Sequence, residues 1–99
     1  MMKHKNSKYE FLAIIKPFLP EDVREGLVAK LKKTFENAGG KIEKEDIWGK
    51  RHLAYKIKGH EEGYYLVYDL ELPAGKMDAI KKELNLEMDL LRFMFTKTK

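Results

Sequence analysis

Residues 20–40, with the sequence PEDVREGLVAKLKKTFENAGG, predict an amphipathic helix that is marked at both ends. Pro20 stands where a helix favours its first residue, and Glu21 and Asp22 place negative charge at the positive end of the helix dipole. Gly39-Gly40 closes the segment, because glycine readily adopts the left-handed backbone that ends a helix. Apolar side chains recur every four residues between these signals, at Val23, Leu27, Leu31 and Phe35. The pattern predicts a helix with one face packed against the rest of the chain.

Strands are predicted on both sides of this helix. Residues 8–16 are rich in aromatic and branched side chains, and Pro17 ends that run. Alternating side chains over 50–58 indicate a half-buried strand, and Gly49 indicates a bulge or bend before it rather than an end. The remaining elements, in chain order, are a strand over 41–48 that continues into 50–58, a polar hairpin loop over 58–63, a strand over 64–72, a helix over 74–85 and a strand over 88–96.

The order strand, helix, strand, strand, helix, strand predicts a ferredoxin-like α+β sandwich, with a four-stranded antiparallel sheet and two helices on one face. Right-handed crossovers place the first and third strands centrally and the second and fourth at the edges. Both chain ends then lie side by side, so residues 1–8 and 92–99 are expected to form one basic patch. Residues 50–58 are expected along the opposite edge.

Length and composition restrict the class of protein. We expect 99 residues to form a single domain over 1–99, with a basic, flexible leader over 1–7 and a basic tail over 97–99. The absence of cysteine excludes a disulfide scaffold and thiolate metal sites. No apolar run approaches the roughly 18 residues that span a bilayer, and no signal-peptide core follows the basic start. The expectation is a cytoplasmic protein without a membrane partner.

Positive charge is segregated along the chain. Residues 1–8, 50–60 and 92–99 hold ten of the twenty lysines and arginines and none of the sixteen carboxylates, although the net charge is only +4. Phosphates respond to local patches rather than to the total, so this distribution favours an anionic partner. The alternative is that surface charges cluster by chance and that chain ends are often basic.

The sequence matches none of the residue patterns that are typical of metal sites, catalytic nucleophiles or phosphate-binding loops. The histidines His4, His52 and His60 lack metal-ligand spacing, and Ser7 is the only serine. Gly39-Gly40 follows a helix, whereas a phosphate-binding loop precedes one. The sequence therefore predicts no catalytic residue, no metal, no cofactor and no small-molecule substrate.

Two segments suggest nucleic-acid binding to different degrees. Residues 62–68, EGYYLVY, only loosely match the strand on which RNA-recognition motifs stack bases, and their tyrosines are expected to pack in the sheet. Residues 49–58, GKRHLAYKIK, combine a glycine, paired basic residues and two further lysines on one edge strand. Such charges protect a strand edge against aggregation, and they also suit phosphates or an acidic partner surface.

The stretch WGKRHLAYKIK, residues 48–58, resembles the signature of the bacterial small-subunit ribosomal protein six family. The resemblance extends over residues 8–96. It includes Tyr9-Glu10 in the first strand, Gly39-Gly40 after the first helix, residues 62–65 at the third strand and Leu91-Arg92 in the last. The lysine-rich leader is longer than in many members, and the acidic C-terminal tail of some members is lacking.

The resemblance implies a ferredoxin-like structural component of the small ribosomal subunit. It further implies binding to the central domain of small-subunit ribosomal RNA, together with ribosomal protein eighteen, during assembly. The implied partner- and RNA-facing edge strand comprises Arg51 and His52 and, by extension, Lys50, Tyr55, Lys56 and Lys58. Tyr9 and Arg92 would lie in a terminal region that approaches RNA. Charge alone adds to that region Lys3, Lys5, Lys8, Lys97 and Lys99.

Two rival interpretations remain open from the sequence. One is a ferredoxin-like module that dimerises through its sheet or binds a small ligand without RNA, since the same fold hosts many functions. The other is a small phosphatase-like hydrolase, which needs an arginine and an asparagine placed together. Asn6, Asn37 and Asn85 are poorly placed for that role.

Overall fold

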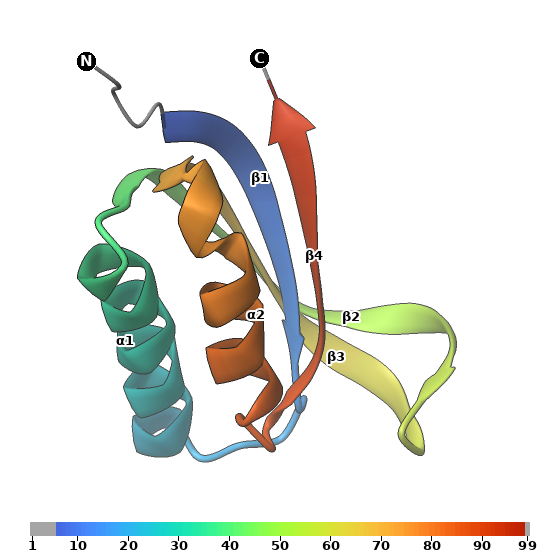
Figure 1. Cartoon of the computed structure of the whole chain (residues 1–99). Coiled ribbons are helices and arrows are strands. Elements are labelled where there is room, and N and C mark those ends of the chain that lie inside the picture. The colour runs from blue at the N-terminus through green and yellow to red at the C-terminus, as the bar shows by residue number, and fades with distance from the viewer. Residues whose placement is uncertain (1–5, 99) are drawn as a thin grey trace, which may run out of the picture.

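A computed structural model describes residues 6–98 of the chain. Figure 1 shows both long helices on one face of a curved sheet. The elements in order are β1 (Asn6–Ile15), α1 (Glu21–Asn37), β2 (Lys41–Ile57), β3 (His60–Pro73), the short 3-10 helix η1 (Ala74–Lys76), α2 (Met77–Asn85) and β4 (Leu90–Thr98). The predicted ferredoxin-like architecture is confirmed.

The sheet has the strand order β2-β3-β1-β4, as the crossover rule predicts, and every neighbouring pair is antiparallel. Lys8 at the start of β1 lies opposite Thr98 at the end of β4. The start of β1 and the end of β4 therefore meet at one end of the sheet (Figure 1).

The helix α1 begins at Glu21, directly after Pro20, one residue later than predicted. Leu27, Leu31 and Phe35 are buried, but Val23 at the start of the same stripe is exposed, so the packed face begins one turn later than the spacing predicts. After the helix, Gly39 adopts a φ of 88°, the left-handed conformation that its position requires.

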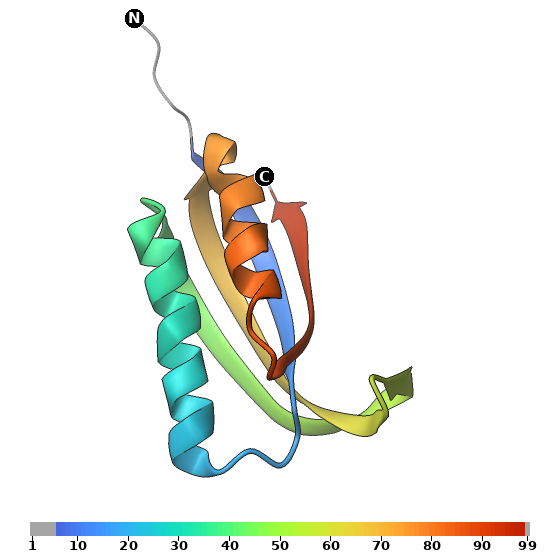
Figure 2. The same ribbon diagram turned by 60° about the horizontal axis from the view of Figure 1, so that its bottom comes forward.

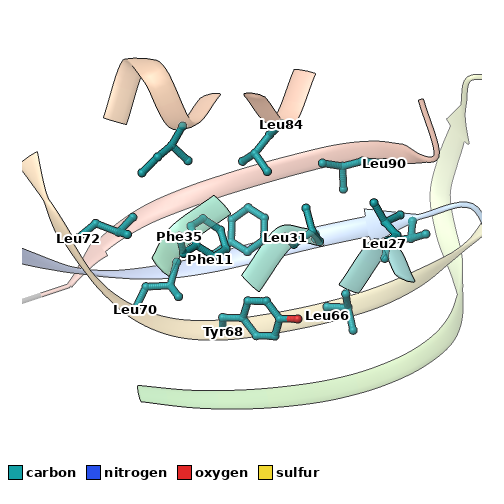
Figure 3. Close-up of a cluster of buried hydrophobic side chains, with 13 residues drawn as sticks. Phe11, Leu27, Leu31, Phe35, Leu66, Tyr68, Leu70, Leu72, Leu84 and Leu90 are labelled. Carbon is teal, nitrogen blue, oxygen red and sulfur yellow. The ribbon is translucent and has the colours of Figure 1, made fainter. Parts of the chain in front are cut away.

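The main core lies between the helices and the inner face of the sheet (Figure 3). The Phe11 ring on β1 meets the Phe35 ring on α1 edge-on, with centroids 5.0 Å apart. Ile80 and Leu84 place α2 on the same core. Each fully buried aliphatic or aromatic side chain contributes roughly 1.5–3 kcal/mol, so this cluster holds the two layers together.

Several predicted boundaries differ from the structure. The loop predicted over 58–63 is wrong for most of its length, because Lys58 and Gly59 alone turn the chain and β3 begins at His60. Both turn residues have positive φ, 50° and 84°, which matches the twist of a tight hairpin. Strand β1 includes part of the predicted leader, and β4 continues to Thr98, so Lys97 lies in a strand rather than in a tail.

The distal ends of β2 and β3 form a bent hairpin over residues 49–63, called the arm below (Figures 1 and 2). The β2–β3 register shifts between Ile47 and Gly49, which confirms the predicted bulge, and again between His52 and Ile57. At the base of the arm, Gly63 has no side chain, and a Cβ there would collide with the side chain of Ile14.

A second, smaller core holds the arm against the outer face of the sheet, the face without helices. Ile57 of the arm packs with Ile14 of β1 and Leu91 of β4, and all three are buried. Leu53 and Tyr65 pack against this cluster. The arm is therefore seated on the sheet by apolar contacts. In addition, no helix within residues 6–98 is long and apolar enough to cross a membrane.

The main core contains one polar atom without a partner. The Tyr68 hydroxyl is buried and makes no hydrogen bond. Burial, and then the nearby Glu45 carboxylate, raise the pKa of this hydroxyl above its ordinary value. That carboxylate is bound instead by Lys32 Nζ at 2.9 Å.

We expect Tyr68→Phe to leave the free energy of unfolding unchanged or to raise it by up to about 1 kcal/mol, since it removes an unsatisfied buried group. Tyr68→Ala, which also removes the ring, should cost about 3–5 kcal/mol. Urea unfolding measures both variants. A loss above about 1 kcal/mol in Tyr68→Phe would show that the hydroxyl is hydrogen-bonded after all.

Candidate nucleic-acid interface

The arm carries a concentration of cations that are not neutralised. Within residues 6–98, Lys50, Arg51 and Lys58 have no carboxylate oxygen within 4.0 Å. The other two predicted basic residues of this strand make only long, exposed contacts. These are Lys56 Nζ to Glu61 at 3.8 Å and His52 Nε2 to Glu62 at 3.7 Å. Pairs of this kind contribute little and leave the arm available to an anion.

Arg92 joins the arm, not the chain ends. The expectation that it lies in a joint patch with residues 1–8 is wrong, because Arg92 pairs with Ile14 near the start of β4. Its Nη1 donates a hydrogen bond to the hydroxyl oxygen of Tyr55 on the arm, at 3.0 Å. The bend of the arm therefore brings together two predicted site residues that are 37 positions apart in the sequence.

Lys58 and Arg92 line one polar recess of about 260 Å³ between the arm and the loop after α2. Asn85 adds an amide to the same recess. The one carboxylate in its lining, Glu87, is held by Lys30 Nζ at 3.1 Å. Two cations and an amide around a hollow are suited to a phosphate group.

An apolar cavity of about 160 Å³ lies beside this recess, between the arm and the outer face of the sheet. Its lining includes Leu12, Leu53, Phe93 and Met94. Met94 is 52% exposed, so the lining is open to an incoming side chain. Apolar cavities of this kind receive side chains rather than phosphates.

Trp48 positions Arg51 at the base of the arm. The indole ring stacks on Tyr65, with centroids 6.1 Å apart and planes 11° from parallel. The Arg51 guanidinium carbon lies 5.0 Å from the centre of the Trp48 ring, within cation–π range. The indole Nε1 donates to Asp46 at 3.3 Å, which fixes the ring.

The terminal candidates lie on two faces of the sheet. Tyr9 and Lys97 are opposite one another on β1 and β4, and the Tyr9 ring meets Phe95 edge-on on the helix-covered side. Lys8, the residue before Tyr9 on β1, points to the outer face, where its Nζ lies 3.9 Å from the Glu43 carboxylate. The predicted residues Lys3, Lys5 and Lys99 lie outside the described residues.

Nothing in residues 6–98 gathers the three or more histidine, cysteine or carboxylate groups that hold a metal ion. His52 and His60 both lie on the arm, and His4 is outside the described residues.

A family model described as ribosomal protein S6 matches residues 8–97 of the chain. The chain belongs to the ribosomal protein S6 family. The small ribosomal subunit protein bS6 of Dictyoglomus turgidum is 37% identical over 89 residues, which is 90% of this chain and 92% of the relative. The bS6 protein of Mycobacterium tuberculosis (strain ATCC 25618 / H37Rv) is 39% identical over 94 residues, with 91% and 94% covered.

The fold agrees with this family. The crystal structure of 30S ribosomal protein S6 from Thermotoga maritima superposes with a TM-score of 0.89 at 32% identity, covering 95% of this chain and 89% of that one. Family membership confirms the predicted resemblance and makes the chain a structural protein of the small ribosomal subunit, not an enzyme.

Sequence reasoning did not assign two residues to this interface. It judged Asn85 poorly placed to join an arginine, whereas Asn85 and Arg92 line the same recess. Asn85 comes from the end of α2, and only the curvature of the arm brings Lys58 to it. Trp48 is the only tryptophan in the chain and stands three residues before Arg51, a spacing that could have indicated their contact.

The Tyr55–Arg92 hydrogen bond should restrain the arm. We expect Tyr55→Phe to speed amide hydrogen exchange over residues 50–57 by roughly 2- to 12-fold, the range for one lost hydrogen bond. Global unfolding should change by less than about 0.5 kcal/mol, because Tyr55 is exposed.

The matched control is Tyr65→Phe, since the Tyr65 hydroxyl makes no side-chain hydrogen bond within residues 6–98. Equal exchange in the two variants would show that Arg92 does not hold the arm.

Proposed function

We propose that this chain binds the central domain of small-subunit ribosomal RNA together with ribosomal protein eighteen during assembly, and that the arm and Arg92 make the principal contact. The observation that carries the proposal is the group of cations around the arm without a carboxylate within 4.0 Å in residues 6–98, Lys50, Arg51, Lys58 and Arg92. Two of them, Lys58 and Arg92, come from distant segments and line one recess, while Lys50 and Arg51 lie at the base of the arm.

The chemistry of the arm suits an RNA backbone. Lysine and arginine side chains that contact phosphates release condensed counterions, which supplies affinity that depends little on the base sequence of the RNA. A-form RNA presents phosphates, ribose hydroxyls and splayed bases rather than major-groove edges. The recess of Lys58, Arg92 and Asn85 is suited to a phosphate, and Arg51, held on Trp48, is a second contact.

The outer sheet face suits a protein. The apolar cavity beneath the arm takes an aliphatic or aromatic side chain, which a polyanion cannot supply in quantity. Farther along the same face, Glu10, Asp46 and Asp69 line another recess of about 110 Å³ with Lys44. Those carboxylates repel RNA and favour a cationic protein surface. The face therefore supports the proposed role of ribosomal protein eighteen.

The chain ends supply a second, weaker contact in this proposal. Tyr9 and Lys97 lie together at the end of the sheet, and Lys8 is adjacent on the other face. Lys3, Lys5 and Lys99 extend the same region in sequence. Their role rests on charge alone.

Replacing Lys50 and Arg51 together by alanine tests the proposal. In a complex with ribosomal protein eighteen and a central-domain RNA fragment, the double variant should bind more weakly. The slope of log K against log salt should become shallower by about 1.4–1.8, roughly 0.7–0.9 per lost phosphate contact. The thermal midpoint should stay nearly unchanged, because both side chains are exposed.

Lys41→Ala with Lys81→Ala is the matched control, with the same loss of charge at exposed positions away from the arm. Equal RNA affinity in the two double variants would contradict the assignment of the arm. A wild-type chain that binds neither RNA nor ribosomal protein eighteen would refute the proposed function itself and favour a module that acts without RNA.

A further inference from the structure

Four side chains outside the apolar cavity form a row of alternating aromatic rings and cations beside the base of the arm. Lys50 Nζ lies 4.4 Å from the centre of the Phe18 ring, and the Arg24 guanidinium carbon lies 4.5 Å from the centre of the Tyr64 ring. Lys50 and Tyr64 are opposite one another on β2 and β3, so their side chains are neighbours on one face. The row Phe18–Lys50–Tyr64–Arg24 is therefore continuous.

The row is assembled from four separate parts of the chain. Phe18 comes from the connection between β1 and α1, Lys50 from β2, Tyr64 from β3 and Arg24 from the start of α1. No sequence spacing relates them, and only the fold brings them together.

The two cations of the row keep their charge available. Within residues 6–98, neither Arg24 nor Lys50 has a carboxylate oxygen within 4.0 Å, and each rests on an aromatic ring instead. By contrast, three other lysines are paired with carboxylates: Lys16 with Asp89 at 3.2 Å, Lys30 with Glu87 at 3.1 Å and Lys32 with Glu45 at 2.9 Å. A ring restrains a cation without neutralising it.

The connection between β1 and α1 leaves the Phe18 side chain exposed. It is 73% exposed, whereas the adjacent Leu19 packs against the main core. Pro17 and Pro20 limit the backbone on either side, and the Lys16 backbone N–H donates to the Asp89 carbonyl at 3.0 Å. A backbone that is already restrained in the unbound protein loses less conformational freedom on binding.

We propose that this row binds a single-stranded segment of ribosomal RNA, with one nucleobase stacked on Phe18 and the flanking phosphates on Lys50 and Arg24. The inference rests on the proposed function, because it takes the same RNA as the ligand. Alternating rings and cations match a chain of bases and phosphates, and stacking on an exposed aromatic ring is a general mode of binding unpaired bases. Tyr64 orients Arg24 and is itself half-buried.

The test compares Phe18→Ala with Phe18→Tyr in binding to the central-domain RNA in the presence of ribosomal protein eighteen. Phe18→Ala should weaken binding by roughly 5- to 150-fold, the range for one lost base–aromatic stack. Phe18→Tyr keeps a ring and should bind within about 2-fold of the wild type. The salt slope should be the same in all three proteins, because no charge is removed.

Leu86→Ala is the control for losing an exposed apolar side chain, since Leu86 is 74% exposed and lies after α2, outside the row. It should bind RNA like the wild type. Photocrosslinking with 5-iodouridine placed in the unpaired positions of the RNA gives an independent measurement, and one such position should link to residue 18 in the wild type and in Phe18→Tyr.

Wild-type RNA binding together with unchanged affinity in Phe18→Ala would overturn this inference and leave the proposed function standing. Weaker binding of Phe18→Ala to ribosomal protein eighteen alone, without RNA, would also overturn it, because the row would then be a protein-docking surface. Failure of the wild-type chain to bind RNA at all would instead refute the proposed function from which the inference starts.

Discussion

The packing of Ile57 against Ile14 and Leu91 determines where the arm lies, and the proposed contacts of the arm with Arg92 and with the outer sheet face depend on that position. Both helices bury the inner face of the sheet through the Phe11 and Phe35 cluster, so the outer face is left without a layer of its own. A hairpin that bends at the Gly49 bulge can therefore rest on this face by apolar contact. At the base of the arm, Gly63 has no side chain, so its backbone can lie close against the side chain of Ile14.

Once the arm is seated, charge and apolar surface separate into regions with different partners. Cations of β2 and β4 converge around the tip and base of the arm, whereas the carboxylates Glu10, Asp46 and Asp69 remain on the outer face. An RNA backbone is attracted to the first region and repelled by the second. A protein partner with apolar and basic side chains has the opposite preference. One sheet can thus hold two ligands at once without either competing for the same surface.

The sequence predicts the order of elements and the strand topology because those depend on local patterns, such as the capped apolar stripe of α1 and the rule for right-handed crossovers. It misplaces Arg92. A position near the chain end in sequence does not show that β4 begins at the far end of the sheet, where Arg92 lies opposite Ile14. It also misses the two-residue turn at Lys58-Gly59, because a lysine with φ of 50° has no distinct sequence signal. The row containing Phe18 and Arg24 could not be predicted from local patterns, because its members come from separate elements that only the fold brings together.

The central claim is that the RNA and ribosomal protein eighteen meet the arm, Arg92 and the outer sheet face, and that the outward surfaces of the helices, apart from Arg24 at the start of α1, take no part. Amide chemical-shift mapping of the isotopically labelled chain, titrated first with ribosomal protein eighteen and then with central-domain RNA, tests this directly. The account predicts that the partner shifts resonances of the outer face around Leu12 and Met94, and that RNA then shifts those around Lys50, Lys58 and Arg92. Shifts concentrated on the solvent-facing side of α1 and α2, with the arm unchanged, would contradict it.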